Sequence, residues 1–183
     1  MNEMTAANLR SAFGGESQAH MRYIVWGKKA EDEGFPNVAR LFRAISYAEE
    51  VHAGNHFHEL ANVGGDFLVA SMAGFGLTST SDNLRGAIDG EHFEVVQMYP
   101  AYMAVAKAQN EKGGIRFFHY ALEAEKIHAA IFTEAKQAVD SGEDMALDDV
   151  QICSVCGHTT QGEAPGRCPV CNQPSEVFVA FRK

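Results

Sequence analysis

One motif occurs twice in this chain, and each copy places a histidine three residues after a glutamate. Residues 48–53 read AEEVHA and residues 124–129 read AEKIHA. On an α-helix, positions i and i+3 share a face. Apolar residues surround both copies at helical spacing, so each pair is expected to point toward the core. Buried carboxylates are costly without a positive partner, and the repeat therefore predicts a cation-binding cluster between helices.

Other acids stand where two further helices should be apolar. Glu16 lies between Phe13 and Tyr23 on the inner stripe of a helix predicted over about residues 4–33. Glu91 and Glu94 share one face of a later helix, again at i and i+3. No Arg or Lys stands at matching inner positions to neutralise these acids. Inward acids on four helices predict a carboxylate-bridged two-metal site inside a four-helix bundle.

The chemistry of two neighbouring cations divides the candidate ligands. Bidentate carboxylates can lie between two cations and screen their repulsion, so Glu49 and Glu125 are expected to bridge. Mixed carboxylate and imidazole ligation favours iron, manganese or zinc over calcium or magnesium. Glu94 is one acid more than a six-residue set needs, and it would let one metal exchange imidazole for carboxylate. The remaining candidate ligands are Glu16, His52, Glu91 and His128.

Four further side chains lie close to the predicted ligands along their helices. Tyr23 and Tyr99 are either packing residues or hydrogen-bond donors beside a redox-active metal. His20 and His56 fall on inner stripes one turn from ligands. Each is either a core or rim histidine or a hydrogen-bond partner of a ligand.

The connections between the helices also follow from the sequence. A second helix is predicted over about 36–62, and residues 64–81, with four glycines, are expected to cross the length of the bundle. Helices two and three would then run parallel. Thr80 or Ser81 is the expected cap of the third helix, Pro100 should distort it one turn beyond the site, and 113–114 (Gly-Gly) should turn into the fourth.

The cysteines lie in two C-x-x-C pairs separated by residues 157–167: Cys153 with Cys156, and Cys168 with Cys171. This spacing predicts one tetrathiolate metal site rather than disulfides. Gly157 and Asn172 follow the pairs, and both residue types tolerate the left-handed turn that aims N–H groups at sulfur. Four thiolates bind either zinc or one iron. Zinc is favoured for an isolated fragment, and iron for a fragment attached to a redox two-metal site.

Composition divides the chain into a bundle over 1–141, an acidic linker over 142–150 and a metal-binding domain over 151–183 that closes with a strand at 176–181. So short a C-terminal domain needs a structural metal. A formal charge of −9 argues against nucleic acid or an anionic membrane surface as partner. No signal peptide is recognised, and the longest uncharged apolar stretch, 67–77, is too short to span a bilayer. A cytoplasmic location is expected.

Taken together, these segments resemble rubrerythrin over essentially the whole chain. The resemblance implies a ferritin-like four-helix bundle with a non-haem di-iron centre, followed by a rubredoxin-like domain. The sequence departs from the family pattern at Asn172, where glycine is commoner, and at His20, which is often not histidine. The segments that carry the resemblance are 15–19, 48–52, 90–94, 98–100, 124–128 and the two cysteine pairs.

The resemblance further implies a peroxidase in oxidative-stress defence. The reduced di-iron centre would give two electrons to hydrogen peroxide, with Tyr23 and Tyr99 beside it. One iron would move between the residues that match Glu94 and His52. The rubredoxin-type iron would pass electrons from an NAD(P)H-linked reductase or a rubredoxin. Members form homodimers in which the cysteine domain of one chain lies near the di-iron site of the other.

Two other functions compete with this one. A ferritin-like protein that oxidises and sequesters iron would share the bundle, but it has no need of a one-electron donor on each chain. The chain could also be an interaction module with zinc in the cysteines and zinc or manganese in the bundle, which would have no redox activity. Loss of the protein's visible colour on reduction with dithionite would exclude this function.

Overall fold

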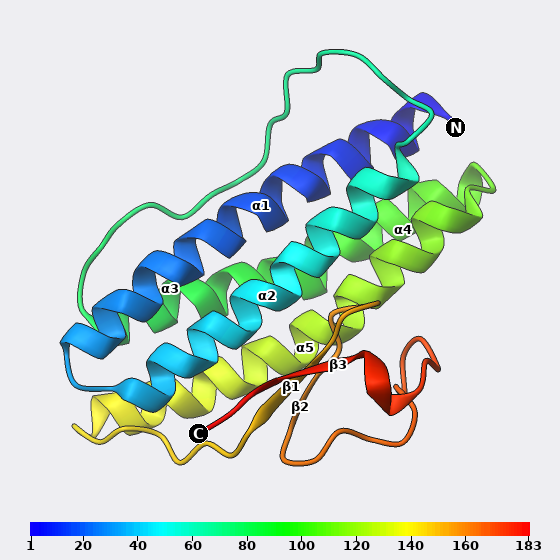
Figure 1. Cartoon of the computed structure of the whole chain (residues 1–183). Helices are drawn as coiled ribbons and strands as arrows, with labels where there is room; N and C mark the ends of the chain where they lie inside the picture. Colours follow the sequence, from blue (N-terminus) through cyan, green and yellow to red (C-terminus); the bar gives the residue numbers. More distant parts are fainter.

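The computed structural model describes all residues 1–183 and is mainly helical, as predicted. The helices form four antiparallel or parallel segments of one bundle, called legs below. Figure 1 shows them packed side by side, with a small β domain against one flank. Two of the helices, joined by the π-helical turn η1 (Glu94–Met98), form the third leg. The helices are α1 (Glu3–Asp32), α2 (Pro36–Glu59), α3 (Thr80–Phe93), α4 (Tyr99–Ala108) and α5 (Lys112–Asp140).

The predicted crossover between the second and third legs is confirmed. Residues 60–79 run back along α1, so that α2 and α3 are parallel (Figure 1). The Trp26 indole N–H, from α1, donates to the Gly76 carbonyl at 2.9 Å. The cap of α3 is Ser79, whose hydroxyl accepts from the Asp82 N–H at 3.1 Å. The predicted Thr80 or Ser81 cap was wrong, because the chain enters helical geometry one residue earlier.

The predicted distortion of the third leg is present but begins at the site itself. The π turn starts at Glu94, and Pro100 occupies the first turn of α4. Proline has no N–H to continue the α-helical hydrogen-bonding pattern. The π turn lies directly before Pro100 in the chain.

The predicted turn at 113–114 was wrong. Both glycines lie inside α5, and the turn occurs at 109–111, where Asn110 adopts a left-handed φ of 57°. A Cβ on Gly113 would overlap the Glu59 carboxylate, and one on Gly114 would lie 2.9 Å from Thr5 Cγ2. These glycines therefore allow close approach of α5 to its neighbours.

The C-terminal domain is a three-stranded antiparallel sheet in the order β2-β1-β3. Its strands are β1 (Val150–Cys153), β2 (Thr159–Gln161) and β3 (Phe178–Phe181). The predicted last strand begins two residues late, because Ser175–Val177 form a 3-10 turn. The sheet packs on the bundle through β1 against α2 and through β2 against α5.

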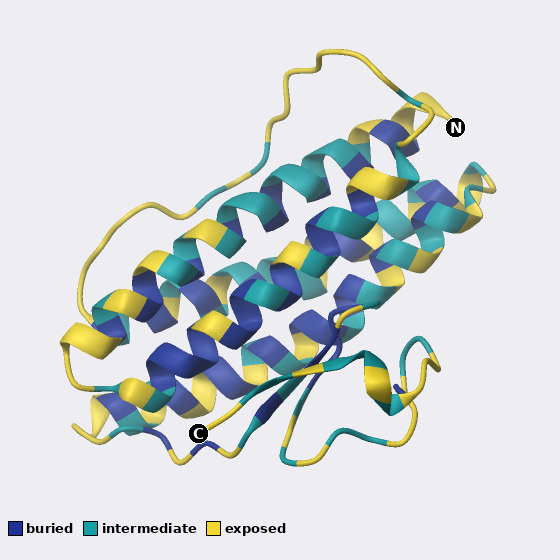
Figure 2. Ribbon diagram, in the orientation of Figure 1, coloured by how far each residue is buried: buried dark blue, intermediate teal, exposed yellow.

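Most of the predicted linker over 142–150, namely residues 142–149, lies against the start of α2, and Val150 already belongs to β1. Asp144 accepts hydrogen bonds from the N–H groups of Asn37 at 2.8 Å and Val38 at 3.2 Å, and so caps that helix. Met145 and Leu147 are buried. Figure 2 shows buried and exposed positions alternating along this segment before it enters the sheet.

One buried side chain, Arg40 on α2, fastens the β domain in place. Its guanidinium donates to the carbonyls of Leu147 and Asp148, each at 2.7 Å, and of Phe181 at 3.0 Å. Since the charged head is buried, these carbonyls supply the partners it needs. The cysteine domain is thereby held on the bundle of its own chain. No helix combines the length and apolar character needed to cross a membrane.

Candidate metal centres

Six of the predicted ligands meet in the middle of the bundle, and all six are buried. Their ligand atoms form two groups, in each of which every pair of atoms lies within 4.8 Å. Glu49 and Glu125 belong to both groups, as acids that bridge two cations would. The first group adds Glu16 and His52, and the second adds Glu91 and His128.

The two histidines face Glu125 in the same way. His52 Nδ1 lies 2.9 Å from one carboxylate oxygen of Glu125, and His128 Nδ1 lies 2.6 Å from the other. Glu49 is shared similarly, with one oxygen 3.0 Å from His52 Nδ1 and the other 3.4 Å from His128 Nδ1. The i,i+3 spacing of the repeated motif produces this near-symmetry, because α2 and α5 present the same face to the centre.

The buried carboxylates of the cluster favour positive charge at its centre. Burial would lower the pKa of both histidines, but Glu125 and Glu49 raise it to about 10 for His52 and about 9 for His128. Burial and mutual repulsion act to raise the pKa of Glu49 and Glu125, yet the two histidines hold it below its usual range. Burial, followed by repulsion from neighbouring acids, raises the pKa of Glu16 well above that range.

The cluster fits two cations. Both carboxylate oxygens of Glu125, one oxygen each of Glu16, Glu49 and Glu91, and Nδ1 of His128 are buried and have no partner in good hydrogen-bond geometry, although imidazole nitrogens lie close to Glu125 and Glu49. Orphaned buried polar atoms are rare in folded proteins. Here they converge on one place, and cations would satisfy them together. The donor set of carboxylates and imidazoles suits iron, manganese or zinc.

Two phenols bond to the outer acids of the cluster. Tyr23 donates to Glu91 at 2.6 Å, and Tyr99 donates to Glu16. His56 Nε2 lies 3.1 Å from the Tyr99 hydroxyl oxygen. All three side chains are fully buried. His56 was predicted to lie one turn from a ligand. It contacts Tyr99, which in turn bonds to the candidate ligand Glu16.

Glu94 stands at the edge of the cluster and is absent from both groups. It is the one predicted acid that keeps partial exposure. Burial, then the charges of Glu125 and Glu49, raise the pKa of Glu94 well above its usual range, while His52 and Arg22 act in the opposite direction. Glu94 lies on the π turn, close to the metal cluster but outside the two groups of six candidate ligands.

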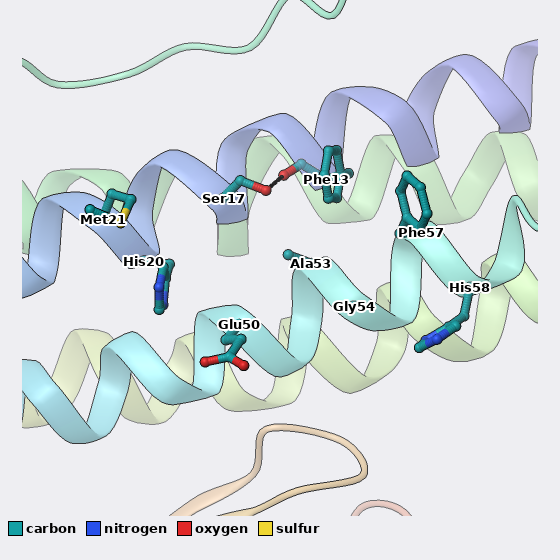
Figure 3. A pocket seen from close by; sticks show the side chains of 9 residues that line it. All are labelled: Phe13, Ser17, His20, Met21, Glu50, Ala53, Gly54, Phe57 and His58. Atoms are coloured by element: carbon teal, nitrogen blue, oxygen red, sulfur yellow. Dashed lines mark hydrogen bonds between the residues drawn. The ribbon is translucent and has the colours of Figure 1, made fainter. Parts of the chain in front are cut away.

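His20 does not reach the cluster. Its Nδ1 lies 2.8 Å from the carbonyl oxygen of Ser46, and its ring borders a cavity of about 500 Å³ between α1 and α2. Figure 3 shows His20 and Met21 on one wall of this cavity and Glu50 on the other. Its lining is mainly apolar and includes none of the six cluster residues.

The four cysteines form the second centre. Their sulfur atoms all lie within 4.8 Å of one another, with Sγ–Sγ distances of 3.6 Å for Cys153–Cys171 and 3.5 Å for Cys156–Cys168. A tetrahedral site with metal–sulfur bonds of about 2.3 Å requires edges near 3.8 Å, so the cradle fits one cation. A hydrogen bond from Cys156 lowers the pKa of Cys153 to about 5.

The turns beside the cysteines have the predicted conformation. Gly157 has a φ of 77° and Asn172 a φ of 60°. Asn172 therefore adopts the left-handed geometry that glycine commonly supplies at this position.

The two centres touch within one chain. His128 Nε2 lies 2.8 Å from Thr159 Oγ1, on β2. A Cβ on Gly157, the residue after Cys156, would collide with the His52 ring. Sequence reasoning missed Thr159 and this role of Gly157, because a contact between domains leaves no periodic pattern.

Comparisons with known proteins agree with both halves. A family model described as Rubrerythrin matches residues 7–136, and one described as Rubrerythrin, rubredoxin-like domain, matches residues 151–179. Rubrerythrin-2 of Clostridium acetobutylicum is 51% identical over 180 residues, which cover 98% of each chain. Nigerythrin of Nitratidesulfovibrio vulgaris is 31% identical over 97% of this chain and 86% of its own.

Solved structures show the same architecture. A structure of fully reduced, all-ferrous nigerythrin matches with a TM-score of 0.85 at 30% identity, over 98% of this chain and 88% of that one. A bacterioferritin of Rhodobacter capsulatus matches with a TM-score of 0.68 at 18% identity, over 77% of this chain and 88% of its own. The second likeness shows the shared ferritin-like bundle.

Proposed function

This chain belongs to the rubrerythrin family, and we propose that it is a non-haem di-iron peroxidase that reduces hydrogen peroxide to water. Electrons would enter through one iron held by the four cysteines, from an NAD(P)H-linked reductase or a rubredoxin. The role would be defence against oxidative stress. The protein would work as a homodimer or higher homo-oligomer.

The observation that carries this proposal is the contact between the centres. His128 lies 2.8 Å from Thr159, and the residue after Cys156 packs on the His52 ring. A one-electron carrier placed against a two-metal site suits repeated reduction of that site. Iron sequestration needs no such carrier, so this contact favours the peroxidase over the storage function. The family resemblance implies electron delivery between subunits, whereas this geometry supplies a route within one chain.

The ligand assignment follows the two groups of buried atoms. Glu49 and Glu125 would bridge, Glu16 and His52 would hold one iron, and Glu91 and His128 would hold the other. Glu94 would exchange with His52 at one iron as the oxidation state changes. Two iron ions bound there would supply the two electrons that split the oxygen–oxygen bond. The four sulfur ligands would be Cys153, Cys156, Cys168 and Cys171.

The surrounding phenols would manage protons. Reduction of one peroxide to two waters consumes two electrons and two protons. Burial, then the charges of nearby acids, raise the pKa of Tyr23 and Tyr99 well above the usual range, so both hydroxyls stay protonated. Each holds its proton in a hydrogen bond to a candidate ligand, Tyr23 to Glu91 and Tyr99 to Glu16. They would fix the orientation of these acids beside the reacting oxygen atoms.

An optical experiment tests the proposal. The protein is reduced without air, stoichiometric peroxide is added, and the visible thiolate-to-iron band is followed, with dioxygen as the comparison. Rapid return of the band with peroxide and slower return with dioxygen is the expected result. A protein with no visible band would carry zinc in the cysteines, and electron transfer through them would be refuted for that form. Faster return with dioxygen would favour the iron-oxidising function.

A further inference from the structure

A second cavity, of about 320 Å³, leads from the surface to the edge of the metal cluster. It lies between α1, the crossover and the start of the π turn. Its floor includes Glu94, the predicted acid that keeps partial exposure. The other acids of the cluster are buried. This cavity therefore connects solvent with Glu94 at the edge of the cluster.

A cation, Arg22, stands in the wall of this cavity. Its guanidinium donates to the Gln18 side-chain oxygen and lies over the rings of Trp26 at 5.1 Å and Tyr23 at 5.4 Å. These contacts fix the group in place. Its Nε–H is buried and has no hydrogen-bond partner, although a buried donor of this kind is normally satisfied. Only one of the N–H groups on Nη1 and Nη2 is used, by Gln18, so the guanidinium keeps charge and hydrogen-bonding capacity in the cavity that Glu94 also lines.

Two glycines keep the guanidinium uncovered. A Cβ on Gly90 would lie 3.7 Å from Arg22 Nη2, and one on Gly74 would lie 3.9 Å from Arg22 Nη1, with no other atom within 4 Å in either case. A longer side chain at Gly90 would therefore extend across the guanidinium and into the cavity. Glycine within a helix lowers stability relative to alanine. We therefore attribute Gly90 to the open space that it leaves beside the guanidinium.

We propose that this cavity is the entry and binding site for hydrogen peroxide, in which Arg22 holds the molecule beside Glu94. The inference rests on the proposed function and adds a specificity-determining residue to it. Peroxide carries two O–H donors and two oxygen acceptors. The guanidinium can donate to one oxygen atom while a carboxyl oxygen of Glu94 accepts from an O–H. Dioxygen has no donor and is a weak acceptor, so Arg22 favours peroxide over dioxygen.

The larger cavity in Figure 3 does not offer this chemistry. Its lining lacks Arg and Lys, and it does not include Glu94. A small polar molecule gains more where a fixed cation and a carboxylate face the same space.

Two variants test the inference, each with a matched control. Arg22→Met removes the guanidinium and keeps the length of the side chain, and Arg43→Met makes the same change at an exposed arginine of α2. Gly90→Leu fills the cavity, and Gly54→Leu makes the same change at a helical glycine with no atom near its Cβ. Iron content and thermal unfolding confirm that each protein is folded and loaded.

The first readout is the rate of reoxidation of the reduced protein, with peroxide and with dioxygen. Arg22→Met should slow the peroxide reaction about tenfold, which corresponds to the loss of one charge-assisted hydrogen bond. Its dioxygen reaction should stay within about twofold of the parent. Gly90→Leu should slow the peroxide reaction at least as much. The second readout is binding of azide to the reduced di-iron protein, followed by its spectrum, which should weaken about tenfold in both variants.

Unchanged peroxide rates and azide affinity in Arg22→Met would overturn the inference. Equal slowing with peroxide and dioxygen would overturn the selectivity assigned to Arg22. If Gly90→Leu fails to load iron, Arg22→Met alone decides. A parent protein that consumes no peroxide would instead overturn the proposed function itself, and this inference with it.

Discussion

His128 bonds from Nε2 to Thr159 Oγ1 at 2.8 Å, and this bond joins the metal cluster to the cysteine domain. The Thr159 hydroxyl donates to the Gly157 carbonyl at 3.2 Å, so it accepts from the histidine. In the neutral imidazole that a metal requires, His128 Nε2 therefore carries the proton, and Nδ1 faces the carboxylates. A hydrogen-bond partner of a metal-binding histidine usually acts in this way, by fixing the tautomer of the imidazole.

Thr159→Val should weaken the cluster without unfolding the β domain. The substitution keeps the shape of the side chain but removes the acceptor, and loss of such a partner typically lowers metal affinity about 10- to 100-fold. Competition of the metal-free protein with a chromophoric chelator for divalent iron measures the change. Thr160→Val, at the partly exposed next position, is the control. Equal affinities for the two variants would show that Thr159 does not orient His128.

Glu94→Ala should keep both irons but slow peroxide turnover about tenfold or more, equivalent to about 1.4 kcal/mol of barrier. The two groups of candidate ligands are complete without Glu94, so the metals should stay bound. The oxidised iron loses the carboxylate that would stabilise it. Metal analysis and steady-state kinetics measure the two effects, with Glu123→Ala on the outer face of α5 as control. Unchanged kinetics would refute ligand exchange at this position.

Cys168→Ser should separate the two halves of the reaction. The bundle should still load iron and react once with peroxide, because its ligands lie outside the cysteine domain. Re-reduction by the electron donor should become slow, since the tetrathiolate site loses one ligand. Single-turnover and steady-state measurements distinguish the steps, and Ser154→Ala is the control. Normal steady-state turnover in Cys168→Ser would mean that electrons bypass the cysteine domain.

Glu33→Gln should reduce stability in a pH-dependent way. The Glu33 carboxylate accepts from the Thr80 hydroxyl at 2.6 Å and from the Thr80 N–H at 2.7 Å, at the start of α3. These bonds lower the pKa of Glu33 to about 2, below about 4.3 for an unfolded chain. The contribution of the Glu33 carboxylate to the free energy of unfolding is therefore fully present above about pH 4.3, and it is lost as the pH falls through about 2.

Thermal unfolding between pH 2 and 7 measures this dependence. Because the Glu33 side chain is partly exposed, its contribution should be at most about 1 kcal/mol. The Tm of Glu33→Gln should lie below that of the parent at pH 7 and approach it near pH 2. Glu31→Gln, which changes an exposed acid on α1, is the control. A Tm difference that stays constant with pH would show that the charge of Glu33 is not involved.

The sequence predicted the bundle and the meeting of its ligands well, because both depend on helical periodicity. Once Glu49 and His52 lie on one face of α2, and Glu125 and His128 on one face of α5, packing of those faces brings them together. The cysteine spacing predicted a tetrathiolate cradle for a similar reason. The left-handed turns at Gly157 and Asn172 were also predicted correctly, because a turn of this kind depends mainly on the residue type at that position.

Features that depend on contacts between distant segments were not predictable in this way. The glycines at 113–114 resemble a turn, and only the packed Glu59 and Thr5 show why they are glycines. Residues 142–149 are acidic and short, as linkers are, yet Asp144 caps α2. Periodicity also assumes one helix type, so it could not predict the π turn at Glu94.

That turn has a consequence for the history of the site. A π turn holds one residue more than the α turn it replaces, so a single insertion can occur there while the helices before and after keep their phase. Glu91 and Tyr99 then stay on their buried positions, and the added residue falls where Glu94 stands. We expect homologous chains whose third leg is unbroken to carry no acid matching Glu94. Glu94, the fifth acid and seventh candidate ligand, would then be a later acquisition by an ancestral six-ligand bundle.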